Sequence, residues 1–172
     1  MASLMEELIG ILQEEDARYK TLLELSKKKT PIIVNGDIQE LQAITDMEQA
    51  AVDAVNAVDK RRMSVMKDIA EVLNKDVETL KLSNLIQILE KRPEERDQLS
   101  RVHDSLKATV GELVVVNDSN RVLIRQSLDM IDFNLSLAQS LRSAPETGDY
   151  TRNAGIAGNV LGAGVSGFDA RQ

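Results

Sequence analysis

Apolar residues recur at helical spacing through most of the chain and predict three long helices. The first is expected over about residues 3–34, where Pro31 should kink it or start a short extra turn. The second is expected over about 38–73. The third, whose apolar positions alternate in steps of three and four, is expected over about 94–142. A shorter stretch over about 79–89 is apolar on nearly all sides, which predicts a short helix buried at one end of a bundle.

The connections between these segments indicate an antiparallel arrangement. Asn35-Gly36-Asp37 combines a glycine suited to left-handed backbone with an aspartate that can cap the next helix. So short a connection between long helices predicts an antiparallel hairpin. Pro93 ends the short helix, because the residue before proline disfavours the α conformation. The predicted fold is all-α: an antiparallel helical bundle or coiled coil of three long helices plus one short helix.

Several polar residues occupy positions on these apolar stripes. Glu15 lies on the stripe of the first helix, and the sequence offers no explanation for it. Asn117 and Asn120 lie three apart on the stripe of the last helix, where two buried amides cost free energy unless both find partners. The pair fits two interpretations, control of helix register or a polar notch in a groove that receives another helix.

The three consecutive lysines at 27–29 are typical of a solvated last helical turn.

The composition changes abruptly after Leu141. Pro145 follows, and six of the nine glycines lie between Gly148 and Gly167. A segment this small and uncharged cannot form a core of its own. The predicted organisation is therefore a helical bundle over 1–142 and a flexible Gly-rich tail over 143–172, which a partner or a second copy could order.

Charge and composition exclude several functions. The net charge of -7 argues against nucleic acid, whose phosphates need lysine and arginine, and against an anionic membrane surface. No apolar stretch is long enough for membrane insertion, and the N-terminus has no signal-peptide pattern. The absence of cysteine fits a reducing compartment. His103 is the single histidine, and no phosphate-binding loop is present, so we expect neither an enzyme nor a cofactor.

Three stretches of the chain together resemble the FlgN-type flagellar export chaperones. They are a leading helix with Leu8, Leu12, Tyr19, Leu22 and Leu23; the turn Ile33-Val34-Asn35-Gly36-Asp37 with Leu41 and Glu48 beyond it; and Asn117-x-x-Asn120-x-x-Leu123-Ile124 with Leu128, followed by a tyrosine-bearing, glycine-rich end. Leucine-rich helices match many families, so the order and spacing of these parts carry the resemblance.

The resemblance implies a cytoplasmic helical chaperone. Such a chaperone binds flagellar hook–filament junction proteins, covers the C-terminal helix that they use to polymerise, and delivers them to the type III export gate. The implied client-binding residues are Leu128, Ile131, Leu135, Ala138 and Leu141, and Tyr150 is the implied contact to the export gate. The notch interpretation adds Asn117, Asn120 and Ile124 to the predicted partner-binding residues.

A second interpretation of the same features stays open. The chain could be a structural helical bundle that self-associates through its last helix and tail as a homo-oligomer. In that case the apolar stripe of the last helix is buried against a copy of itself, whereas a chaperone leaves it free for a client.

Overall fold

The computed structural model describes residues 2–143, which fold into α-helices and one short 3-10 helix. The elements in chain order are α1 (Ala2–Asn35), α2 (Ile38–Leu73), α3 (Leu82–Ile88), the 3-10 helix Leu89–Lys91 and α4 (Pro93–Ser143). No strand occurs among these described residues, and the predicted all-α class is confirmed. The chain divides into two compact units, one ending at Phe133 and the other beginning at Asn134. Apart from Ser143, the predicted tail lies outside the described residues.

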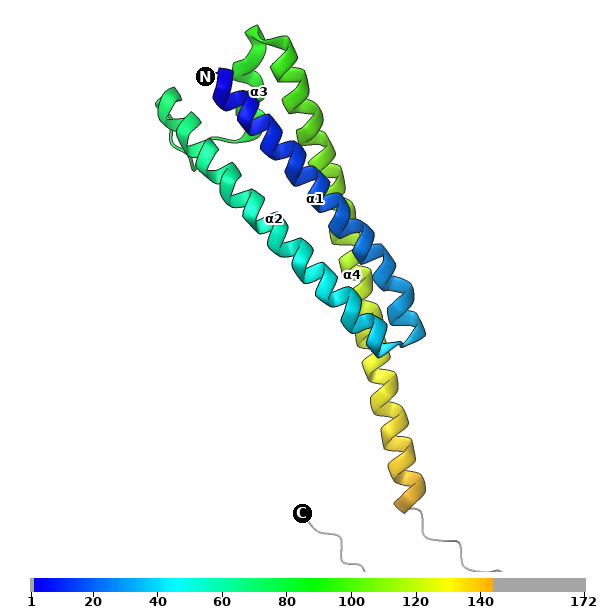
Figure 1. Cartoon of the computed structure of the whole chain (residues 1–172). Coiled ribbons are helices and arrows are strands. Elements are labelled where there is room, and N and C mark those ends of the chain that lie inside the picture. Colours follow the sequence, from blue (N-terminus) through cyan, green and yellow to red (C-terminus); the bar gives the residue numbers. More distant parts are fainter. Residues whose placement is uncertain (1, 144–172) are drawn as a thin grey trace, which may run out of the picture. The chain divides into compact units, whose positions relative to one another are not determined.

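The hairpin between α1 and α2 forms at the predicted turn (Figure 1). Gly36 has a φ of 70°, the left-handed conformation that glycine adopts without strain. The Asp37 side chain then accepts a hydrogen bond from the Glu40 backbone N–H at 2.9 Å and caps α2. α1 continues as one helix through Pro31 to Asn35, so no separate extra turn forms there.

One apolar cluster joins all four α-helices. It is built around fully buried side chains that include Leu8 and Leu12 of α1, Ile69 of α2, Leu85 of α3 and Leu99 of α4. Burying one such side chain contributes roughly 1.5–3 kcal/mol. A smaller cluster lies further along α1. The bundle is therefore held most firmly at the end that contains α3.

The short helix α3 differs from the predicted helix in where it begins and in how much of its surface is buried. α3 begins at Leu82 because the residues before it form a turn: the Asp76 carboxylate accepts a hydrogen bond from the Glu78 N–H, and the Asp76 carbonyl accepts one from the Thr79 N–H. Ile88 is 38% exposed. The expected burial on nearly all sides is therefore wrong, although α3 does pack into the core.

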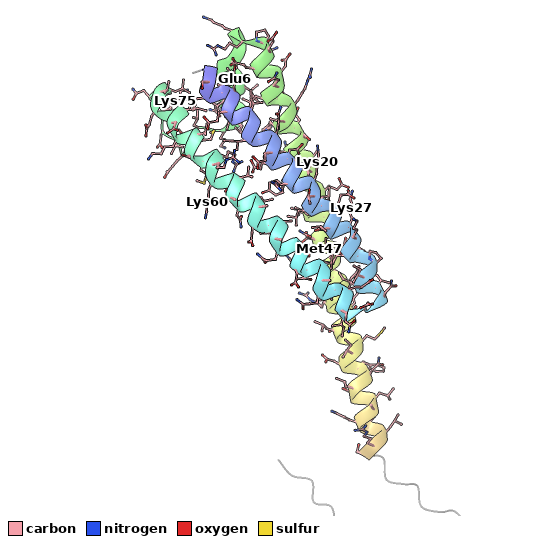
Figure 2. All side chains as sticks on the ribbon, in the orientation of Figure 1. Glu6, Lys20, Lys27, Met47, Lys60 and Lys75 are labelled. Carbon is pink, nitrogen blue, oxygen red and sulfur yellow. The ribbon has the colours of Figure 1, made fainter. Side chains whose placement is uncertain are left out.

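α4 is one helix of 51 residues and passes through Gly111 without a break. α1 and α2 have 34 and 36 residues, so neither is long enough to cover the whole of α4. Charged side chains such as Lys60 of α2 and Lys75, which follows α2, are exposed (Figure 2). Among the described helices, none combines the length and apolar character needed to cross a bilayer.

Candidate partner-binding site

The C-terminal part of α4 exposes large apolar side chains. The residues of the predicted stripe are buried or half-buried as far as Asn120 and Ile124, except Asn117, which is exposed. Every residue from Leu128 to Ser143 is exposed. Within the first unit, Leu128 and Ile131 are 56% and 51% exposed. Contiguous apolar surface of this kind is typical of interaction sites.

The second unit contributes the remaining stripe residues predicted from the sequence and described here. Leu135 and Leu141 are 57% and 70% exposed, and Ala138 between them is also exposed. Steps of three residues along a helix keep side chains on neighbouring parts of its surface. The structure thus leaves these positions accessible, and their role in binding a partner stays a prediction.

A second set of exposed apolar residues was missed by the sequence reasoning. Met130, Phe133 and Leu137 of α4 are all exposed and are also spaced by three and four. At about 100° of rotation per residue, a side chain two positions away points to nearly the opposite side of the helix. The signal was present in the sequence, but a search for one continuous stripe passes over a second.

Asn120 uses its amide inside the bundle. Its Nδ2 donates to the Ser26 carbonyl at 2.9 Å, and its Oδ1 accepts from the Thr30 hydroxyl at 2.7 Å. Both partners belong to α1, so these bonds fix how α1 and α4 are aligned. For Asn120, the geometry is that expected of register control.

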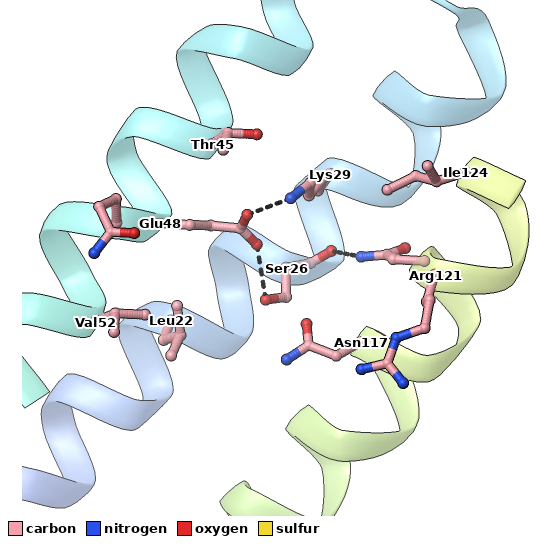
Figure 3. A pocket seen from close by; sticks show the side chains of 11 residues that line it. Leu22, Ser26, Lys29, Thr45, Glu48, Val52, Asn117, Arg121 and Ile124 are labelled. Carbon is pink, nitrogen blue, oxygen red and sulfur yellow. Dashed lines mark hydrogen bonds and ion pairs between the residues drawn. The ribbon is translucent and has the colours of Figure 1, made fainter. Parts of the chain in front are cut away.

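Asn117 has a different environment. It is exposed, and its side chain points from α4 into a pocket of about 460 Å³ whose walls come from α1, α2 and α4 (Figure 3). Arg121 and Ile124 line the same pocket. The notch interpretation therefore fits the position of Asn117, whereas Asn120 lies at the pocket wall with its amide already paired.

A partly buried ion pair lines one side of this pocket. Lys29 Nζ donates to Glu48 Oε2 at 2.6 Å, and the Ser26 hydroxyl donates to Glu48 Oε1 at 3.0 Å (Figure 3). The Lys29 side chain is only 17% exposed. The expectation of a solvated last turn at the three lysines is thus wrong in two ways. α1 continues beyond them to Asn35, and α2 supplies Lys29 with a carboxylate that the local sequence could not reveal.

Glu15, the unexplained residue on the α1 stripe, faces Arg62 of α2. Its Oε1 lies 3.6 Å from the Arg62 guanidinium, and its Oε2 is buried without a hydrogen-bond partner. Burial raises the pKa of Glu15, although the positive charge of Arg62 opposes this and Asp59 reinforces it. Burial also raises the pKa of Tyr19, and the nearby negative charge of Glu15 adds a smaller effect in the same direction. This cluster lies in the bundle, away from the exposed part of α4.

Two further predictions concern other parts of the chain. Tyr150, the implied contact to the export gate, lies outside the described residues. His103 is partly exposed beside Asp104, at 3.2 Å. Within residues 2–143, no three histidine or carboxylate side chains are grouped so that they could hold a metal ion.

Comparison with known proteins gives the family. A family model described as "FlgN protein" matches residues 1–157. The chain is also 26% identical over 119 residues to the "Uncharacterized protein YvyG" of Bacillus subtilis strain 168, an alignment that covers 69% of this chain and 71% of that protein. No solved structure matches the chain. Since the family model matches most of the sequence, the chain belongs to the FlgN family of flagellar export chaperones.

Proposed function

We propose that this chaperone binds the C-terminal helix of flagellar hook–filament junction proteins in the cytoplasm and delivers them to the type III export gate. The observation that carries the proposal is the row of exposed apolar residues on α4. It begins with Leu128 and Ile131 in the first unit and continues with Leu135, Ala138 and Leu141 in the second. An amphipathic client helix can cover such a row through anchors spaced by three and four residues.

This binding mode explains how a chaperone would prevent early polymerisation. A client helix whose apolar side packs on α4 cannot at the same time pack on another client. The anchors on α4 are mostly aliphatic, because the chain has only 2% aromatic residues. Delivery also requires release, so an affinity between about micromolar and nanomolar suits the task, roughly -8 to -12 kcal/mol. Tyr150 is the proposed contact to the export gate.

The test compares two exposed apolar residues that lie two positions apart on α4. A synthetic peptide with the C-terminal helix of a junction protein from the same organism is titrated into the full chain by calorimetry. Leu135→Asp should weaken binding at least about thirtyfold, because it removes apolar contact and places a charge under the client. The control is Phe133→Asp, which places the same charge at an exposed residue on the side of the helix away from Ile131 and Leu135.

The outcomes distinguish a wrong location of the binding site from a wrong function. Saturable binding that only Leu135→Asp disrupts supports the proposal. Unchanged binding by Leu135→Asp shows that the site is elsewhere. If neither the peptide nor the full-length client binds at several hundred micromolar, the proposed function is wrong.

Self-association is the second candidate function, and the exposed row of Met130, Phe133 and Leu137 favours it. A homo-oligomer would bury this side of α4 against a copy of itself. Sedimentation velocity over a wide concentration range distinguishes the two. A monomer that Leu137→Asp leaves unchanged supports the client role, whereas a dimer that Leu137→Asp dissociates supports assembly.

A further inference from the structure

The pocket next to the exposed row of α4 has a polar lining that apolar client contacts alone would not require. We name it the α1–α2–α4 pocket; it is lined by Ser26 and Lys29, by Glu48, and by Asn117, Arg121 and Ile124, among others. Its volume of about 460 Å³ is in the range of pockets that hold small ligands or the end of a peptide. All of these residues belong to the first unit.

The charges in the pocket favour a negatively charged group. Lys29 and Glu48 are paired, and both oxygens of Glu48 are engaged, by Lys29 and by Ser26. Arg121 has only a loose contact, 3.7 Å to Asp118, and both side chains are well exposed. Two cations and one carboxylate leave the lining with one net positive charge, carried by an arginine whose donors remain available.

Asn117 adds a neutral donor beside Arg121. Its side chain points into the pocket (Figure 3) and makes no hydrogen bond with any described residue. A guanidinium and an amide N–H that face the same space suit a carboxylate, which can accept from both.

Ile124 connects the pocket to the proposed client surface. It lines the pocket, and Leu128 and Ile131 follow it at four and seven positions, on the same side of α4. Ile131 lies roughly 10 Å along the helix from Ile124. A client helix that packs on this row therefore has one of its ends at the pocket.

Helix polarity decides which end it is. The C-terminal end of a helix carries unpaired carbonyls and the negative end of the helix dipole, and at a chain terminus it also carries a carboxylate. We propose that the α1–α2–α4 pocket binds the C-terminal carboxylate of the client through Arg121 and Asn117, with the client helix antiparallel to α4. This inference rests on the proposed function, and adds the client's direction and the chemical group that is recognised.

The experiment compares two forms of one peptide. The C-terminal helix of a junction protein is synthesised with a free carboxylate and with a C-terminal amide, and both are titrated into the full chain by calorimetry. We expect amidation to weaken binding about five- to tenfold, a modest factor because Arg121 is largely exposed.

Two variants show whether that factor comes from the pocket. In Arg121→Gln the two peptides should bind equally, at the level of the amide in the unmodified protein. Arg101→Gln is the matched control: Arg101 is also exposed on α4 but is about 30 Å from the pocket along the helix, and it should retain the difference. Since Arg121 is exposed, its replacement should not affect folding.

Each outcome bears on one claim. Equal binding of the two peptides to the unmodified protein overturns the carboxylate site and leaves the proposed function in place. A difference that persists in Arg121→Gln also overturns it, because the carboxylate would then be recognised elsewhere. If neither peptide nor full-length client binds, the proposed function itself fails.

Discussion

Replacing Glu15 with methionine should stabilise the protein. Glu15 is 2% exposed, and its Oε2 has no hydrogen-bond partner. A buried, unpaired polar atom costs about 1–3 kcal/mol. Methionine has nearly the same length and no such atom, so Glu15→Met should raise the free energy of unfolding by about this amount near pH 7.5. Arg62 keeps its ion pair with Asp59 and is not left unpaired.

The gain should depend on pH in a defined direction. Burial raises the pKa of Glu15 above its ordinary value of 4.5, so over the interval between these two values the folded chain binds a proton more tightly than the unfolded chain does. The unmodified protein therefore gains stability as the pH falls through that interval. The variant lacks the group, and its advantage should shrink as the pH falls toward 4.5.

Urea unfolding followed by circular dichroism, at about pH 7.5 and about pH 5, measures both effects. Glu14→Met is the matched control, because Glu14 is the neighbouring glutamate and is partly exposed on the surface. It should change stability by less than about 0.5 kcal/mol. A Glu15→Met variant that is less stable than the unmodified protein at both pH values would refute the reasoning.

Two further pairs of variants test the fold. Asn120→Ala should lower the free energy of unfolding by about 1–3 kcal/mol in chemical denaturation, since it removes both hydrogen bonds between this buried side chain and α1. Asn117→Ala at the exposed position should change it by less than about 0.5 kcal/mol. Gly111→Ala should raise the thermal midpoint, because the helix gains up to about 1 kcal/mol and the added methyl group meets no atom within 4 Å. Gly36→Ala has equal space but should lower the midpoint, because its φ of 70° is strained for alanine. An Asn120→Ala variant that is as stable as Asn117→Ala, or a Gly36→Ala variant with a higher thermal midpoint than Gly111→Ala, would contradict the geometry.

Local signals in the sequence were enough to predict most of the fold. The hairpin needs only a residue in the left-handed conformation, Gly36, and a capping side chain, Asp37, and these two residues are adjacent. The start of α3 was predicted wrongly because Asp76 accepts hydrogen bonds from the backbone N–H groups of Glu78 and Thr79, which hold this stretch in a turn. The spacing of apolar residues gives no sign of these bonds.

The candidate site was harder to predict, because it depends on where the other helices stop packing against α4. The apolar positions before and after Ile124 look alike in the sequence, yet those before it pack against the bundle and those after it are exposed. The roles of Glu15 and Lys29 depend on Arg62 and Glu48 of α2, which are far away in the chain. No local pattern could identify those partners.

Hydrogen exchange by mass spectrometry on the full chain, with and without a full-length junction protein, tests the central claim most directly. Amides of α4 from Ile124 to Ser143 are predicted to exchange more slowly in the complex, because a bound client helix would limit opening of this exposed part of α4. The outer side of α2 near Lys60 should be unchanged. Saturable binding that protects α2, and leaves the end of α4 as fast as in the free protein, would contradict the account.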